Sequence, residues 1–514
     1  MLRHVLTTLT LLFLYQLIGN AQTHTTCGTS TSDFDIISQR LIDNKAFLKA
    51  NPEMARSRNA TTYIPLKFHL VGQDDGSERI SYTRIMDQMC LLNEVFADTE
   101  MQFYIFEGFN EINSTEIYED HLTTRANMAM AREKENSAVN IWILGEAQIS
   151  GSVGQTFGYY TPFNDWIVIR KIHINSRGYT LPHEIGHYFS LLHTFNGWGE
   201  NGSPPYDSSY EGKPAPNSSP GGVVNEYADG SNCEIAGDMI CDTPADYLYL
   251  EKLNFNGCEY TGTMLDPKGE PLKPDPALIM GYFADNCLDN FTAEQVEVMR
   301  VDLQSAQRRA IRRGFTPTVP IIDQAANLTA PIDRLVTDSY NKVNLTWEAV
   351  PNATSYIIEI DNIRAFSANS LQFISSTNSF LLDNQLNPNR NYFWRIYAFN
   401  EATSCGTPSD IERFRTGLST ATSSIETVNK LDVIPNPVKQ SAGITLSVQA
   451  TASFDAAIKI FNFTGQQVWS KSNHTFTNGS SQELIKTKQL TAGIYFVHLE
   501  NAQGIITKKI IVQE

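Results

Sequence analysis

The 514-residue sequence is poor in positive charge: 39 Lys and Arg residues stand against 56 Asp and Glu residues, which gives a net charge of −17. Nonspecific nucleic-acid binding needs a basic face, so we expect no nucleic-acid partner. After the first 21 residues, no stretch approaches 18 consecutive apolar residues, and we therefore expect no transmembrane segment. The sequence also lacks G-x-S-x-G and P-loop patterns, so the chemistry that depends on them loses support.

Cysteine is also scarce, with seven residues in the chain. Seven are too few for a disulfide-dense scaffold, and an odd number leaves at least one thiol to explain in an exported protein. Export is predicted by residues 1–21, where a basic start precedes an apolar run over 5–18 and the small residue Ala21. This is the pattern of a secretory signal peptide. We therefore expect some disulfide bonds and one thiol with a separate role.

Residues 22–58 form a polar segment with a modest helical pattern. The segment ends in a basic pair, Arg56 and Arg58, where a protease could cut. The sequence therefore predicts a removable N-terminal segment over residues 22–58.

Residues 59–318 alternate between strand and helix patterns. Strand patterns cover 63–70, 101–106, 139–144 and 166–174. One face of a predicted helix carries Ile85, Met89, Leu92 and Phe96, and a second helix pattern covers 292–312. This alternation indicates an α/β (α+β) unit.

The remaining sequence changes to short alternating patterns typical of β-sheets. Residues 325–418 and 430–514 each contain such segments, with a Ser/Thr-rich linker over 418–427 between them. The predicted fold is therefore multidomain, with an α/β unit followed by two all-β sandwich domains.

The residues that carry chemistry are concentrated in one short window. His183 and His187 are four residues apart, so on a helix they share one face and can bind one metal ion, with Glu184 beside them. His193 follows six residues later. Three neutral nitrogen ligands with an open fourth position are typical of catalytic zinc, and Glu184 is placed to act as a general base. The alternative is a helix with ordinary core or surface histidines.

The window resembles the long zinc motif of the metzincin metalloproteases, and Thr194-Phe195 after the last histidine resembles the pappalysin branch. Similar segments extend over about residues 60–315. The resemblance implies a zinc endopeptidase with a Met-turn at Met280. It also implies that Tyr282 stabilises the oxyanion and that Asp285 gives a preference for Arg or Lys after the cut. A buried core tyrosine and an ordinary loop aspartate are the alternatives.

Ser190 departs from the family pattern, which has glycine at the bend before the third ligand. Glycine tolerates a positive φ, whereas serine in that conformation costs about 1 kcal/mol. We therefore expect a working site with somewhat altered local geometry.

Acidic residues are dense over 200–246, and calcium would relieve their repulsion. The segment around Asp238, Cys241 and Thr243 is similar to a pappalysin segment associated with calcium, and these three are the candidate ligands. A solvated acidic loop is the alternative.

Four cysteines, Cys233, Cys241, Cys258 and Cys287, lie in the same region, and two disulfides there would hold a loop-rich segment together. Sequence alone allows three pairings. The resemblance favours Cys233–Cys258 and Cys241–Cys287.

Cys27 lies upstream of the predicted cut site. A thiolate can fill the open metal position, and the resemblance implies a cysteine switch that keeps the precursor latent. A disulfide from Cys27 to Cys90 or Cys405 is the alternative, and these two cysteines otherwise have no assigned role.

The C-terminal half indicates where the protein acts. Residues 325–418 resemble a fibronectin type III module, and residues 430–514 resemble the C-terminal sorting domain of the bacterial type IX secretion system. The resemblance implies export through the periplasm of a Gram-negative bacterium, followed by release or attachment to the outer-membrane surface. A second adhesive β-sandwich is the alternative for the last unit.

These observations predict a secreted zinc-dependent endopeptidase that acts on protein or peptide substrates and is made as a zymogen. The competing prediction is a non-catalytic surface adhesin with a vestigial metal site. An intact Glu184 beside all three histidines favours the enzyme.

Overall fold

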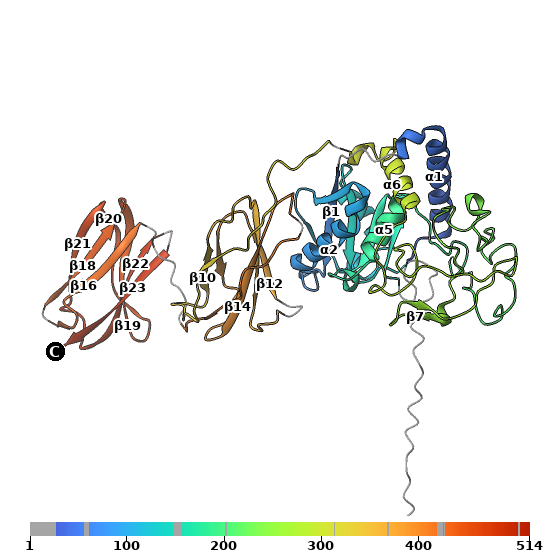
Figure 1. The fold of residues 1–514 in the computed structure, drawn as a ribbon. Helices are drawn as coiled ribbons and strands as arrows, with labels where there is room; N and C mark the ends of the chain where they lie inside the picture. Colours follow the sequence, from blue (N-terminus) through green and yellow to red (C-terminus); the bar gives the residue numbers. More distant parts are fainter. Residues whose placement is uncertain are drawn as a thin grey trace, which may run out of the picture.

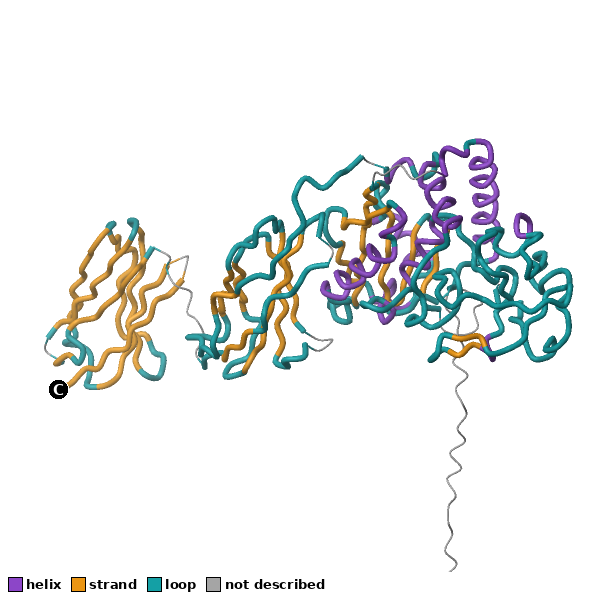
Figure 2. Tube along the Cα trace, viewed as in Figure 1, coloured by secondary structure: helices purple, strands orange, loops and turns teal. Residues whose placement is uncertain are grey.

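The protein was analysed as a computed structural model, which describes residues 27–55, 61–148, 156–200, 203–312, 314–366, 370–403, 405–418, 425, 427–440, 442–501 and 504–514. The predicted signal peptide and the basic pair Arg56 and Arg58 lie outside the described residues. Figures 1 and 2 show an N-terminal unit of helices, strands and long loops, followed by two units built of strands. The predicted order of a mixed α/β unit and two all-β units is confirmed.

A six-stranded sheet forms the centre of the N-terminal unit. Its strands are β1 (Thr62–Gly72), β2 (Met101–Ile105), β3 (Asn110–Asn113), β4 (Val139–Leu144), β5 (Gly158–Thr161) and β6 (Trp166–Arg170). The strand order is β2-β1-β4-β6-β5, and β3 pairs with the end of β1. All pairings are parallel except that of β5 with β6. This places the short antiparallel strand β5 at the edge of the sheet.

Helices cover both faces of this sheet, because its central strands are apolar on both sides. The helices are α1 (Thr31–Ala50), α2 (Tyr82–Val95), α3 (Thr115–Glu119), α4 (Thr124–Glu133), α5 (Thr180–Tyr188) and α6 (Ala293–Gln304). Ile141 and Ile143 of β4 pack in one core with α1, α2, α5 and α6. Trp142 and Leu144, one residue out of phase, pack in a second core with α3 and α4. The strand periodicity thus builds a three-layer arrangement.

Two predicted elements end earlier than expected. Helix α6 begins after Thr292, whose side chain forms a capping box with Gln295, but it stops at Gln304 rather than 312. The cause is Ser305, whose φ of −60° and ψ of 161° are extended. The predicted strand over 166–174 ends at Arg170, where the chain turns into a short 3₁₀ helix, Lys171–His173.

The first β unit is a sandwich of a three-stranded and a four-stranded sheet, with strand orders β13-β10-β9 and β12-β11-β14-β15. Its strands are β9 (Leu328–Ala330), β10 (Lys342–Trp347), β11 (Ser355–Asp361), β12 (Leu371–Ser375), β13 (Ser379–Asp383), β14 (Asn391–Phe399) and β15 (Glu412–Arg415). Trp347 and Trp394, from the two sheets, are buried together in its core. Both tryptophan side chains therefore serve packing between the two sheets.

The second β unit also consists of two sheets, with orders β16-β18-β21 and β17-β23-β22-β19-β20. Its strands are β16 (Val428–Ile434), β17 (Val438–Lys439), β18 (Gly443–Ala450), β19 (Phe454–Asn462), β20 (Gln467–Phe476), β21 (Gly479–Lys486), β22 (Gly493–Asn501) and β23 (Gly504–Gln513). Alternate residues of these strands form one continuous apolar core.

In the residues that the structure describes, no helix is both long and apolar enough to cross a membrane.

The disulfide pairing differs from the one that the family resemblance favours. The bonds are Cys233–Cys241 and Cys258–Cys287, with Cα–Cα distances of 5.0 Å and 5.4 Å, instead of Cys233–Cys258 and Cys241–Cys287. A 3₁₀ turn at Cys233–Ile235 and the bends that follow fold this loop back on itself, so the nearer cysteine is the one within bonding reach.

The two unassigned cysteines form the third disulfide. Cys90 of α2 is bonded to Cys405, which follows β14 in the first β unit, so the bond links two units that are 315 residues apart in sequence. Among the described residues this leaves Cys27 as the free cysteine. The alternative of a disulfide at Cys27 is therefore wrong.

Candidate metal centre

Helix α5 and the bend after it bring three histidines together. His183 and His187 lie one turn apart on α5, which packs beside the edge strand β5. The helix ends at Tyr188, and Ser190 adopts a φ of 69°, the left-handed conformation expected at this bend. The backbone N–H of Leu191 then donates to the Gly186 carbonyl over 3.0 Å, so the chain turns back. This reversal carries His193 to the other two imidazoles.

The Nε2 atoms of the three histidines point at one another. Nε2 of His193 lies 3.0 Å from Nε2 of His183 and 3.1 Å from Nε2 of His187. Each Nδ1–H has its own acceptor: His183 donates to the Ile279 carbonyl over 2.7 Å, and His187 donates to the Leu191 carbonyl over 2.8 Å. Nδ1 of His193 is bonded to a carboxylate, described below. The three Nε2 lone pairs therefore converge, which is unfavourable unless a cation lies between them.

The electrostatics of the cluster also suit a metal ion. Burial and the neighbouring imidazole of His193 lower the pKa of His183 to about 3, and burial lowers that of His193 to about 3. For His187, burial followed by both neighbouring imidazoles lowers the pKa. Neutral imidazoles are the form that ligates metals, so this donor set fits a single metal ion.

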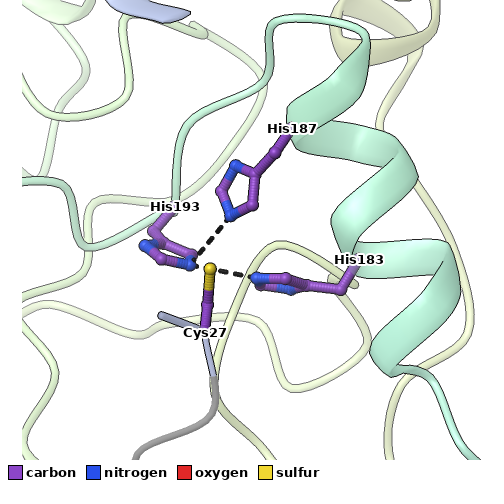
Figure 3. Close-up of side chains that lie close together, drawn as sticks. All are labelled: Cys27, His183, His187 and His193. Atoms are coloured by element: carbon purple, nitrogen blue, oxygen red, sulfur yellow. Dashed lines mark hydrogen bonds between the residues drawn. The ribbon is translucent and has the colours of Figure 1, made fainter. Parts of the chain in front are cut away.

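Cys27 completes the cluster (Figure 3). Its Sγ atom and the three imidazole nitrogens all lie within 4.8 Å of one another. Burial and the nearby Glu184 carboxylate raise the pKa of the Cys27 thiol. The protein alone therefore favours the neutral thiol of Cys27. A cation bound among these ligands would favour its deprotonation to the thiolate.

The segment that presents Cys27 is held along the sheet edge. Cys27 forms a parallel bridge with Gly158 of β5, and the backbone N–H of Gly28 donates to the Gly158 carbonyl over 2.8 Å. The Thr29 hydroxyl donates to the Tyr160 carbonyl over 3.2 Å. An extended N-terminal segment therefore lies beside β5 and across the histidine cluster.

Glu184 and Tyr282 flank the same point. Glu184 is fully buried, and one of its carboxylate oxygens lies 3.6 Å from Sγ of Cys27, while Oε1 has no hydrogen-bond partner among the described residues. Burial raises the pKa of Glu184 to about 8. The Tyr282 hydroxyl accepts a hydrogen bond of 3.0 Å from the backbone N–H of Cys27. The Glu184 carboxylate and the Tyr282 phenol therefore both lie beside Cys27, next to the three histidines.

A turn at Met280 supports the cluster from below. A Cβ on Gly186 of α5 would lie 2.4 Å from Sδ of Met280, so only glycine permits this close packing. The Met280 carbonyl accepts from the backbone N–H of Thr194 over 3.2 Å, and its neighbour Ile279 accepts from His183. The turn thus fixes both the α5 side and the His193 side of the site.

Glu200 also belongs to the site, although no sequence pattern pointed to it. Its Oε1 atom accepts a hydrogen bond from Nδ1 of His193, and its Oε2 atom accepts from the backbone N–H of Gly197 over 3.0 Å. The side chain is 6% exposed. An acid seven residues past the last histidine has no helical or strand periodicity to mark it. Its role follows from the loop geometry, in which it orients the His193 imidazole.

Helix α1 of the N-terminal segment packs directly on His187 and on Ser190 of the loop that follows α5. The Phe34 ring lies edge-on to the ring of His187, with centroids 5.3 Å apart. Nδ2 of Asn44 donates to Oγ of Ser190 over 2.8 Å and to Oδ1 of Asp302 over 3.1 Å. The N-terminal segment therefore contacts the cluster from two directions.

The predicted calcium ligands are brought together only in part. The Thr243 hydroxyl donates to the buried Asp238 carboxylate over 3.0 Å. Cys241 is exposed, and its backbone N–H donates to Oε2 of Glu294 over 2.6 Å. Glu226 is only 2% exposed, and its Oε2 atom has no hydrogen-bond partner among the described residues. We define Glu226, Asp238 and Glu294 as the acidic cluster.

Asp285 lies in an exposed loop close to the start of α5. Burial followed by the carboxylates of Asp289, Glu94 and Asp285 raises the pKa of Tyr179, the residue just before that helix. The surface beside the histidine helix is therefore acidic.

About half of the chain is similar in sequence to known extracellular metalloproteases. An extracellular metalloprotease of Colletotrichum graminicola is 24% identical over 263 residues, which cover 46% of this chain and 74% of that protein. An extracellular metalloprotease of Neurospora crassa is 26% identical over 293 residues, which cover 52% of this chain and 84% of that protein. Among solved structures, the chicken CNTN1 FN1–FN3 domains are 15% identical, cover 37% of this chain and 69% of that chain, and have a TM-score of 0.17.

The C-terminal unit matches a family model of its own. Residues 432–513 match the model described as a secretion system C-terminal sorting domain. The chain is thus related to extracellular metalloproteases and carries a sorting domain. Both findings support a secreted or cell-surface protein.

Proposed function

We propose that the chain is the latent precursor of a secreted zinc endopeptidase of the pappalysin type within the metzincins. The observation that carries this proposal is the convergence of His183, His187 and His193 with Cys27 on one point beside Glu184. Three imidazole nitrogens with one replaceable ligand are the donor set of a catalytic zinc site. A zinc ion bound there would supply a Lewis acid that polarises a peptide carbonyl and acidifies a water molecule.

The chain's own residues would carry the proton and charge movements. Glu184, with one oxygen unpartnered among the described residues, takes the proton of the attacking water and returns it to the leaving amine. Tyr282 donates its hydroxyl proton in a hydrogen bond to the oxyanion of the substrate; in the precursor the same hydroxyl oxygen accepts a hydrogen bond from the backbone N–H of Cys27. Glu200 holds the ring of His193 in place.

Latency follows from the position of Cys27. Its sulfur would be the fourth ligand of a bound metal ion, and its backbone N–H already donates to the Tyr282 hydroxyl, so Cys27 would exclude both water and substrate. Removal of residues 22–58 would expose both. This is a cysteine-switch zymogen, and the contacts of Phe34 and Asn44 add to the affinity of the segment.

Substrate choice and stability involve the two acidic regions. Asp285 beside α5 favours Arg or Lys after the cut, because a carboxylate pairs with a guanidinium or ammonium group.

The acidic cluster fits a calcium ion. The Oε2 atom of Glu226, which has no hydrogen-bond partner among the described residues, and the buried carboxylate of Asp238 would bind it, with Thr243 and the carbonyl of Cys241 as further oxygen ligands. The first β unit would serve as a fibronectin type III-like module, and the sorting domain would engage the type IX secretion machinery.

One assay tests the proposed function. The processed protein is incubated with a denatured protein, with and without a chelator, alongside a Glu184→Ala variant. Cleavage should require both the metal and Glu184, and fragments should begin with Arg or Lys. Cleavage that persists in the chelator or in the variant would refute the mechanism, and fragments without this enrichment would refute the role of Asp285.

A further inference from the structure

Helix α1 inserts a lysine into the acidic cluster. Nζ of Lys45 lies 2.8 Å from Oε1 of Glu294 and 3.8 Å from Oε2 of Glu234, and it donates to the Met239 carbonyl. The Lys45 side chain is 15% exposed. The ammonium group therefore ends in a confined place rather than in solvent.

The buried carboxylates of the cluster respond to this ammonium. The pKa of Asp238 is raised to about 8: burial and, less strongly, Glu294 raise it, whereas the hydrogen bonds from Ile240 and Thr243 and the ammonium of Lys45 lower it. The pKa of Glu226 is also raised to about 8, because burial, Asp238 and Glu294 outweigh the lowering effect of Lys45. Ionisation of these carboxyls is thus unfavourable without a nearby cation, and Lys45 supplies part of the positive charge that favours their ionised form.

The cluster is also built too tightly to be an ordinary solvated loop. Glu226 and Asp238 are 2% and 1% exposed. A Cβ on Gly237, which has a φ of 57°, would lie 2.9 Å from the unpartnered Oε2 of Glu226. The main chain therefore packs directly against a buried carboxylate oxygen that has no hydrogen-bond partner among the described residues, and carboxylate oxygens are the ligands that a hard divalent cation takes.

From these contacts we infer that Lys45 is the cation of the acidic cluster in the precursor, and that calcium replaces it when α1 leaves. The inference rests on the proposed calcium site and adds its regulation. The ammonium and calcium compete for the same negative charge, and the Met239 carbonyl bonded to Lys45 becomes free for the ion. Because linkage is reciprocal, calcium also weakens the docking of α1 and so promotes release of Cys27 from the histidines.

The test uses the full-length precursor with Glu184→Ala, which prevents self-processing. Calcium binding is measured by isothermal titration calorimetry in this parent, in Lys45→Met and in Lys49→Met. Lys49 lies one turn further along α1 and is exposed, so its variant removes the same charge away from the cluster. Lys45→Met should bind calcium at least tenfold more tightly than the parent, and Lys49→Met should match the parent. Equal affinities in all three would overturn the exchange, whereas no calcium binding in any of them would refute the calcium site itself.

A second measurement covers the case in which Lys45→Met detaches α1 by itself. The reaction rate of the Cys27 thiol with a disulfide reagent is followed in the parent with and without saturating calcium. Calcium should accelerate the reaction severalfold in the parent and leave Lys45→Met unchanged. A parent whose thiol reacts at the same rate in both conditions would contradict the exchange, whatever the variant does.

Discussion

Ser190 makes two opposing contributions, and substitution can separate them. Its φ of 69° places a side chain in the left-handed region, at a cost of about 1 kcal/mol relative to glycine. Its buried hydroxyl accepts the 2.8 Å hydrogen bond from Asn44 of α1, which contributes about 1 kcal/mol to the docking of that helix. Ser190 therefore strains the loop that carries His193 and, under the proposed function, stabilises the latent state.

The backbone strain and the hydrogen bond at Ser190 predict different results for two variants. Ser190→Gly removes both the strain and the hydroxyl, so the N-terminal unit of the processed protein should melt about 2–4 °C higher. Docking of α1 should weaken about fivefold, because only the hydrogen bond differs between the docked and the released state. Ser190→Ala keeps the Cβ and removes the hydroxyl, so it should weaken docking equally without raising the melting temperature.

The assay combines thermal unfolding of the processed proteins with Cys27 thiol reactivity of the precursors in a Glu184→Ala background. Asn44→Ala removes the same hydrogen bond from the other side, together with the bond from Asn44 to Asp302. A double variant of Asn44→Ala and Ser190→Ala should therefore react like Asn44→Ala alone, because the Ser190 hydroxyl has already lost its donor. Additive effects, or a Ser190→Gly protein that melts below the parent, would refute the reasoning.

Three further predictions concern latency, ligand orientation and the link between units. A Cys27→Ala precursor should cleave protein substrates at least tenfold faster than the uncleaved parent, and a precursor that stays inert would disprove the switch. Glu200→Gln should lower metal affinity about 10–100-fold in a chelator competition, because His193 loses its charged acceptor; unchanged affinity would remove Glu200 from the site. A chain cut between the first two units should stay joined on a non-reducing gel and separate on reduction, and Cys90→Ser with Cys405→Ser should separate without reductant. Separation of the parent without reductant would contradict that link.

The histidine cluster was predictable because its signal is local. His183, Glu184 and His187 fall within one turn of a helix, so spacing alone brings them together, whereas the bend at Ser190 was expected from the resemblance to the metzincins. Most strands of the central sheet were predictable for a similar reason, since their apolar runs are long enough to be recognised in the sequence. A free thiol was predictable because an odd number of cysteines leaves at least one without a disulfide partner, and Cys27 is the free cysteine among the described residues.

What the sequence did not reveal depends on long-range packing. Glu200 reaches His193 through an irregular loop, and Lys45 meets Glu294 across almost 250 residues, so no periodicity marks either contact. The edge strand β5 is four residues long and was overlooked. The disulfide pairing was expected wrongly because loop conformation, rather than cysteine spacing, decides which sulfurs come within reach.

The central claim is that one zinc ion joins Cys27 to the three histidines in the latent chain. X-ray absorption at the zinc edge of the purified precursor measures the ligand types directly. We predict one zinc per chain with one sulfur and three nitrogen ligands, and loss of the sulfur ligand after the N-terminal segment is removed. A precursor without stoichiometric zinc, or with zinc that has no sulfur ligand, would contradict the account.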